Sequence, residues 1–144
     1  MQSIVEQRTR RRALEKPARI LLVDDDPDLL IGLSDALDFW LAPVVIDTCL
    51  SPQEALQLLH ASPHRYQLIA TDLCMPRMNG LTLVRQARRL CPHVPIVLMT
   101  AYDVVPYFDE ASWLGVYDTL RKPFVREEMI AVFRHALAEA RLDH

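Results

Sequence analysis

Residues 71–80 read TDLCMPRMNG and follow a short apolar run, Leu68-Ile69-Ala70, that is typical of a buried strand. The stretch places the carboxylate of Asp72 at the point where this strand ends. A proline and a glycine then interrupt regular backbone, and a helical pattern of apolar residues begins at Leu81. The sequence therefore predicts an acidic group held at the end of a strand, at the mouth of a sheet.

Four further apolar runs share this character, being short and bounded by residues that break regular structure. Such runs are typical of strands that are buried on both faces of a parallel sheet. The predicted strands are residues 19–23, 44–46, 68–71, 96–99 and 116–120. Helically spaced apolar residues fill the intervals, and the predicted helices are residues 27–40, 52–61, 81–90, 105–114 and 126–141. This alternation predicts an α/β fold, a doubly wound five-stranded parallel sheet with five helices.

Capping signals mark several of the helix ends. Asp26 and Pro27 fit the N-cap and the first position of the first helix. Ser51-Pro52-Gln53-Glu54 fits a capping box at the start of the second helix. Gly115 is expected just after the last residue of the fourth helix.

The composition is that of a globular protein of one domain. Of the 144 residues, 51% are hydrophobic and 24% are charged, and the net charge is −3. This charge does not by itself indicate a nucleic-acid or membrane partner, and no apolar run is long enough to span a membrane. The three cysteines, an odd number without C-x-x-C spacing, favour free thiols in the cytoplasm.

Residues 1–17 form a basic N-terminal extension, and residues 18–144 are predicted to form the domain. The extension contains Arg8 and Arg10-Arg11-Arg12, and Pro17 closes it. It fits a frayed terminus or an additional helix, and it also fits a basic arm that contacts an acidic or phosphate-rich partner. The arginines alone do not distinguish these interpretations.

Functional side chains recur at the ends of the predicted strands. They are Asp24 and Asp25 after the first strand, Asp72 after the third, Thr100 after the fourth and Lys122 after the fifth. In a parallel sheet these carboxyl ends meet at one edge, where a crevice forms at a reversal of strand order. Three carboxylates crowded there repel one another, and a divalent cation, usually Mg²⁺, relieves that repulsion.

The same residue types suit phosphoryl transfer. A carboxylate can attack phosphorus and form an acyl phosphate. The equatorial oxygens of the transferred group then need charge neutralisation, which Mg²⁺, the ammonium of Lys122 and the hydroxyl of Thr100 would supply. The occurrence of all these groups at successive strand ends indicates the function more strongly than any one of them.

These stretches are similar to the receiver domain of two-component response regulators. The resemblance extends over about residues 18–140 and is carried by residues 21–26 (LLVDDD), 72–80 (DLCMPRMNG), 99–101 (MTA) and 122–124 (KPF). It implies a flavodoxin-like fold with strand order 2-1-3-4-5. Residues 115–118 (GVYD) are most similar to receivers of the nitrogen-regulation type.

The resemblance also implies a role for each matching residue at the centre of the site. Asp72 would be the phosphoacceptor. Thr100 would be the hydroxyl that turns toward the phosphoryl group, and Lys122 would be the cation that pairs with it. The bond between Lys122 and Pro123 is often cis in this family.

The implied metal site uses the acidic residues and one backbone group. Asp25 would bind Mg²⁺ directly, and Asp24 would act largely through water. Asp72 and the main-chain carbonyl of Cys74 would complete the protein ligands. Asp26, although adjacent, is assigned to the helix cap instead.

The chain departs from the family pattern three residues before the lysine. Receivers usually have Tyr or Phe there, which swings inward as the threonine moves, whereas this chain has Thr119. Activation is therefore expected to be relayed differently across the fourth helix, fifth strand and fifth helix. Asn79, where Asp is common, is expected to matter little. Tyr102 is expected to restrict attacking water and so to slow loss of the phosphoryl group.

The sequence thus predicts a phosphorylation-controlled signalling switch rather than a conventional enzyme. A histidine kinase or a histidine phosphotransfer protein would donate the phosphoryl group. An effector protein would bind the face between the fourth and fifth helices, and a homodimer is also compatible. Neither membrane contact nor direct nucleic-acid binding by this domain is expected. The chain fits a single-domain regulator, a phosphate shuttle, or the receiver of a longer transcriptional regulator.

Two other interpretations remain open. A Mg²⁺-dependent hydrolase of the haloacid dehalogenase type also uses a strand-end Asp, a Thr and a Lys. However, Pro27-Asp28 replaces the Gly-Thr expected after its D-x-D motif, and residues 72–80 would be unexplained. A pseudo-receiver used only for binding is compatible with Thr119, although the full set of pocket residues argues against it.

Overall fold

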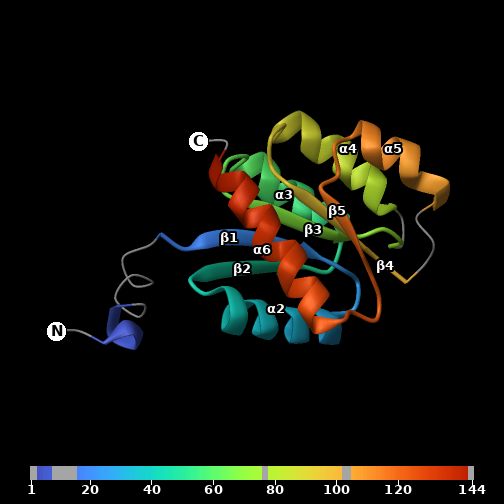
Figure 1. The fold of residues 1–144 in the computed structure, drawn as a ribbon. Helices are drawn as coiled ribbons and strands as arrows, with labels where there is room; N and C mark the ends of the chain where they lie inside the picture. The colour runs from blue at the N-terminus through green and yellow to red at the C-terminus, as the bar shows by residue number, and fades with distance from the viewer. Residues whose placement is uncertain (1–2, 8–15, 76–77, 102–104, 143–144) are drawn as a thin grey trace.

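Five parallel strands form a sheet in the order β2-β1-β3-β4-β5, which confirms the implied topology (Figure 1). The computed structural model describes residues 3–7, 16–75, 78–101 and 105–142. The strands are β1 (Ala18–Val23), β2 (Val44–Cys49), β3 (Leu68–Asp72), β4 (Ile96–Thr100) and β5 (Asp118–Arg121). Because all five run in the same direction, their carboxyl ends lie along one edge of the sheet.

Helices cover both faces of this sheet (Figure 1). Side chains alternate between the two faces, so that Leu21 of β1 packs in one apolar cluster and Leu22 in the other. Strands β3 and β4 are buried at every position, which explains their unbroken apolar runs. One face carries α2 (Pro27–Leu41) and α6 (Arg126–Leu142), and the other carries α3 (Pro52–Ala61), α4 (Gly80–Leu90) and α5 (Phe108–Trp113).

The predicted caps start α2 and α3. Asp26 accepts hydrogen bonds from the N–H groups of Asp28 and Leu29, and Ser51 accepts one from the N–H of Glu54. Within the extension, residues 4–7 are helical, whereas most of the arginine-rich stretch lies outside the described residues. In the part of the chain that the structure describes, no helix combines the length and apolar character needed to cross a membrane.

The region before β5 differs from the sequence-based expectation. Pro106 lacks an N–H group, and a short 3₁₀ helix, η1 (Val105–Tyr107), precedes α5 where one longer helix was predicted. At its other end, α5 closes in a Schellman motif, in which Gly115 and Val116 donate their N–H groups back to the last turn. Gly115 has a φ of 69°, as expected for this position. Val116 therefore belongs to the motif that caps α5, and β5 begins only at Asp118.

The first residue of α4 lies against the backbone of Asp72. Asn79 caps this helix by accepting a hydrogen bond from the N–H of Thr82, and the N–H of Gly80 donates to the carbonyl of Leu73 at 2.7 Å. A Cβ atom at position 80 would lie 2.2 Å from the carbonyl oxygen of Asp72. Only glycine therefore fits here without displacing the backbone that carries the acid.

We expect Gly80→Ala to lower the free energy of unfolding by about 1–3 kcal/mol, the usual effect of forcing extra volume into a packed site. Gly32→Ala is the matched control, because a Cβ atom there would meet nothing within 4 Å. In the interior of α2 this substitution should stabilise by roughly 0.5–1 kcal/mol. Urea unfolding of both variants measures the difference, and equal effects at the two positions would contradict the steric explanation.

Candidate functional site

Three carboxylates converge at the carboxyl edge of the sheet. Asp24 directly follows β1, Asp25 comes next, and Asp72 is the last residue of β3. One oxygen from each lies within 4.8 Å of the others. Asp24 and Asp72 are buried, whereas Asp25 is exposed. These hard oxygen donors fit a cation such as Mg²⁺, because they bring strong negative charge to a small volume.

The side chain of Lys122 enters the same site from the end of β5. Its Nζ lies 2.6 Å from Oδ2 of Asp24 and 3.4 Å from Oδ2 of Asp72. Its backbone N–H donates to the carbonyl of Thr100 at 2.7 Å, which fixes the lysine beside the end of β4. Thr100 is itself buried at 2% exposure. The structure thus brings together the side chains of the four predicted charged residues, and it places the backbone of Thr100 next to that of Lys122.

Backbone contacts hold the two buried acids in position. The N–H of Asp26 donates to Oδ1 of Asp24 at 3.0 Å, while Asp26 itself serves as the helix cap. The N–H of Cys74 approaches Oδ1 of Asp72 at 3.4 Å. The N–H of Leu73 donates to the carbonyl of Met99 in β4 at 2.9 Å. The loop after Asp72 is therefore tied to its own carboxylate and to the neighbouring strand.

The electrostatic environment favours proton retention by Asp72. Burial raises the pKa of its carboxyl, the nearby Asp24 carboxylate raises it further, and the ammonium of Lys122 partly offsets both. Burial acts to lower the pKa of Lys122, but its hydrogen bond to Asp24 and the charges of both carboxylates outweigh this effect and raise it. Lys122 is thus held in its charged form beside the two acids.

The other residues that the sequence singled out do not belong to this cluster of charged side chains. Cys74 is exposed beside the site. Tyr102 lies outside the described residues. Thr119 is half-buried on β5, opposite Leu98 of β4, and so presents no ring to this region. The Lys122–Pro123 bond is cis, as the resemblance implied.

Sequence reasoning missed the capping role of Asn79. The available signal was an N-cap residue placed directly before a helical pattern of apolar residues. Asn and Asp cap helices about equally well, which is consistent with the expectation that Asn79 in place of Asp matters little.

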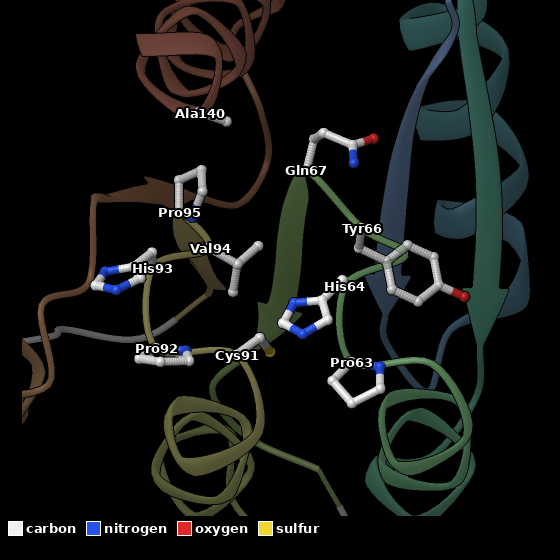
Figure 2. A pocket seen from close by; sticks show the side chains of 10 residues that line it. All are labelled: Pro63, His64, Tyr66, Gln67, Cys91, Pro92, His93, Val94, Pro95 and Ala140. Carbon is white, nitrogen blue, oxygen red and sulfur yellow. The ribbon is translucent and has the colours of Figure 1, made fainter. Parts of the chain in front are cut away.

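A separate hollow of about 320 Å³ lies at the amino edge of the sheet, opposite the edge that carries the carboxylates, and Figure 2 shows its lining residues. Its walls come from the loops that precede β3 and β4 and from the last turns of α6. The lining residues include Tyr66, Cys91 and Val94, which are buried, and the exposed His64 and His93. None of the five strand-end residues lines this cavity, so it is separate from the acidic site.

Comparison with known proteins agrees with this geometry. A family model described as the response regulator receiver domain matches residues 20–134. Response regulator protein FleR of Pseudomonas aeruginosa is 38% identical over 128 residues, which are 85% of this chain and 25% of that protein. The C4-dicarboxylate transport transcriptional regulatory protein DctD of Rhizobium meliloti is 32% identical over 123 residues, which are 85% and 26% of the two chains. The chain thus spans about a quarter of the length of these relatives.

A solved structure of a receiver domain has the same fold. The signal receiver domain of an HD domain-containing protein from Pseudomonas fluorescens Pf-5 superposes with a TM-score of 0.79 and 26% sequence identity. The match covers 88% of this chain and 99% of that one.

We expect Asp72→Asn to raise the free energy of unfolding at pH 7 in EDTA. Because folding raises the pKa of Asp72, ionisation of this carboxyl destabilises the folded protein as pH rises from the ordinary value of 3.8 through the raised one. The gain should therefore vanish below that ordinary value, where the wild-type carboxyl is protonated in both states. Asp24 remains to pair with Lys122.

Chemical unfolding across this pH range measures the difference between Asp72→Asn and wild type. Asp109→Asn, at an exposed position on α5, is the control and should leave the profile unchanged. A lower stability of Asp72→Asn at pH 7 would show that burial and repulsion do not dominate at this acid.

Proposed function

Because the chain belongs to the response regulator receiver domain family, we propose that it is a phosphorylation-controlled switch of a two-component system. Asp72 accepts a phosphoryl group from a histidine kinase or a histidine phosphotransfer protein. The domain takes part in its own phosphorylation and dephosphorylation and has no separate substrate to turn over. This assignment favours the receiver over a haloacid dehalogenase-type hydrolase.

The observation that carries the proposal is the position of Lys122 between the two buried carboxylates. Its ammonium lies 3.4 Å from an Asp72 oxygen and 2.6 Å from an Asp24 oxygen. The lysine nevertheless follows β5, which is an edge strand of the sheet and is not paired with β1 or β3. A cation so placed beside a buried acid supports transfer of an anionic group to that acid.

The transfer step follows from the groups at the sheet edge. An Oδ atom of Asp72 attacks phosphorus, and the new O–P bond forms as the P–N bond to the donor histidine breaks. The electron pair of that bond stays on the imidazole nitrogen, which takes up a proton from solvent. Lys122 stabilises the negative charge on the transferred oxygens, and the hydroxyl of Thr100 donates to one of them.

Mg²⁺ is the cofactor that we assign to this site. Asp24, Asp25, Asp72 and the main-chain carbonyl of Cys74 are the groups that would hold it. When bound, it would neutralise the carboxylates and the equatorial oxygens of the phosphoryl group. The convergence of the three carboxylate oxygens within 4.8 Å supports this assignment.

The wider context of the domain is also proposed. Residues 18–144 form the receiver, which works in the cytoplasm, and an effector binds across α5, β5 and α6. The longer relatives support a place in a larger transcriptional regulator, with output through other segments. A basic arm at residues 1–17 and a homodimer remain compatible with this scheme. Thr119 in place of the aromatic residue implies that the phosphorylated state is relayed by another route.

Incubation with Mg²⁺ and acetyl phosphate, followed by intact-mass analysis, tests the proposal. We expect the wild-type protein to gain one phosphoryl group, and EDTA to prevent the gain. Asp72→Asn should gain none, because it lacks the nucleophile. Asp25→Asn should weaken Mg²⁺ binding by at least about tenfold, since even indirect partners of a metal have effects of this size.

Asp26→Asn is the matched control for Asp25→Asn, because Asn is an equally good N-cap residue and Asp26 is not assigned to the metal. It should be phosphorylated like the wild type. Failure of the wild type to bind Mg²⁺ or to gain mass would support the pseudo-receiver instead. Turnover of a small phosphate ester would support the hydrolase.

A further inference from the structure

Two arginines of α4, Arg85 and Arg88, reach the neighbouring helix α5 and are here called the arginine clamp. They are three residues apart and therefore lie on one side of the helix. Nε of Arg85 lies 3.1 Å from Oε1 of Glu110 on α5. This pair is exposed, so it is the weaker half of the clamp.

Arg88 forms the stronger half through backbone groups. Its guanidinium donates to the carbonyl of Leu114 at 2.7 Å, to that of Gly115 at 2.9 Å, and to that of Val94. The first two carbonyls close the C-terminus of α5, where a cation also interacts favourably with the helix dipole. The third belongs to the loop before β4. One side chain thus fastens α4 to α5 and to the sheet.

The helix that the clamp holds has few other anchors. α5 is six residues long, too short to be stable alone, and Ala111 is its one buried residue. Phe108 and Trp113 are 65% and 88% exposed, respectively. The N-cap residue, Tyr107, makes no side-chain capping hydrogen bond. The position of α5 therefore depends strongly on polar contacts with α4.

The opposite end of α4 contacts the phosphoacceptor loop. Gly80, its first residue, lies against the carbonyl of Asp72 and donates its N–H to Leu73. Because Gly80 packs directly on this loop, we expect a change in the loop to displace the first turn of α4. The helix between Gly80 and Arg88 continues without a break, so a displacement at one end is carried to the other.

We propose that the arginine clamp transmits the state of Asp72 to the surface of α5. This inference rests on the proposed function, and it assigns the route that Thr119 leaves open. The signal passes from the phosphorylated loop to Gly80, along α4, and through Arg88 to the C-terminus of α5. Arg85 adds a second contact that keeps the two helices moving together.

The two tryptophans allow a direct test, because Trp113 lies on α5 and lines, together with Arg88, a second hollow that is distinct from the one in Figure 2. In a Trp40→Phe background labelled with 5-fluorotryptophan, Trp113 gives one ¹⁹F resonance. Mg²⁺ and acetyl phosphate should shift that resonance. Arg88→Met should gain the same phosphoryl mass but lose the shift, whereas Arg89→Met, an exposed neighbour on α4, should retain both.

Glu110→Gln provides a second variant that leaves the buried contacts intact, and it should reduce the shift without changing the mass gain. An unchanged shift in both Arg88→Met and Glu110→Gln, with normal phosphorylation, would overturn the clamp but leave the switch standing. A mass gain without any shift in the Trp40→Phe background would do the same. Absence of the mass gain in that background would overturn the proposed function, and with it the signal that the clamp would carry.

Discussion

The ion pair between Lys122 and Asp24 is the interaction on which the functional edge depends. The two residues are 98 positions apart, and β3 and β4 lie between their strands in the sheet. Two buried carboxylates this close would disfavour the folded state if neither were neutralised. The 2.6 Å contact places a cation where it compensates one acid and still approaches the other. The lysine that compensates the repulsion between the two carboxylates therefore also makes this edge of the sheet suitable for binding an anionic group.

Steric constraint at Gly80 complements this electrostatic one. The N-terminus of α4 is packed directly on the carbonyl of Asp72, and the loop is also bonded to β4 through the N–H of Leu73. The acid is thus fixed from both sides by backbone groups, which do not change rotamer. This rigidity has a second consequence, because a helix that touches the acid at one end is well placed to respond to it at the other.

The helices differ in how they are held against the sheet, and α5 is the exception among them. α2 and α6 pack on a continuous apolar cluster that includes Leu37 and Phe133, both fully buried. α5 buries little apolar surface and is held largely by Arg85 and Arg88. Apolar packing resists small displacements, whereas a few polar bonds can be rearranged at low cost. We therefore expect α5 to change its position while the other helices stay fixed on the sheet.

The sequence by itself determined the fold class, the order of strands and helices and the five strand-end residues, because periodicity, caps and short motifs are local properties. Asp72 and Lys122 could be placed at the site since parallel strands must share one edge. Only the tertiary structure decided that Lys122 pairs more closely with Asp24 than with Asp72, that β5 begins after Val116, and that Arg88 binds the end of α5. Each of these features depends on contacts between segments that are distant in sequence. A local sequence pattern contains no information on the distances between such segments or on which of several partners a side chain binds.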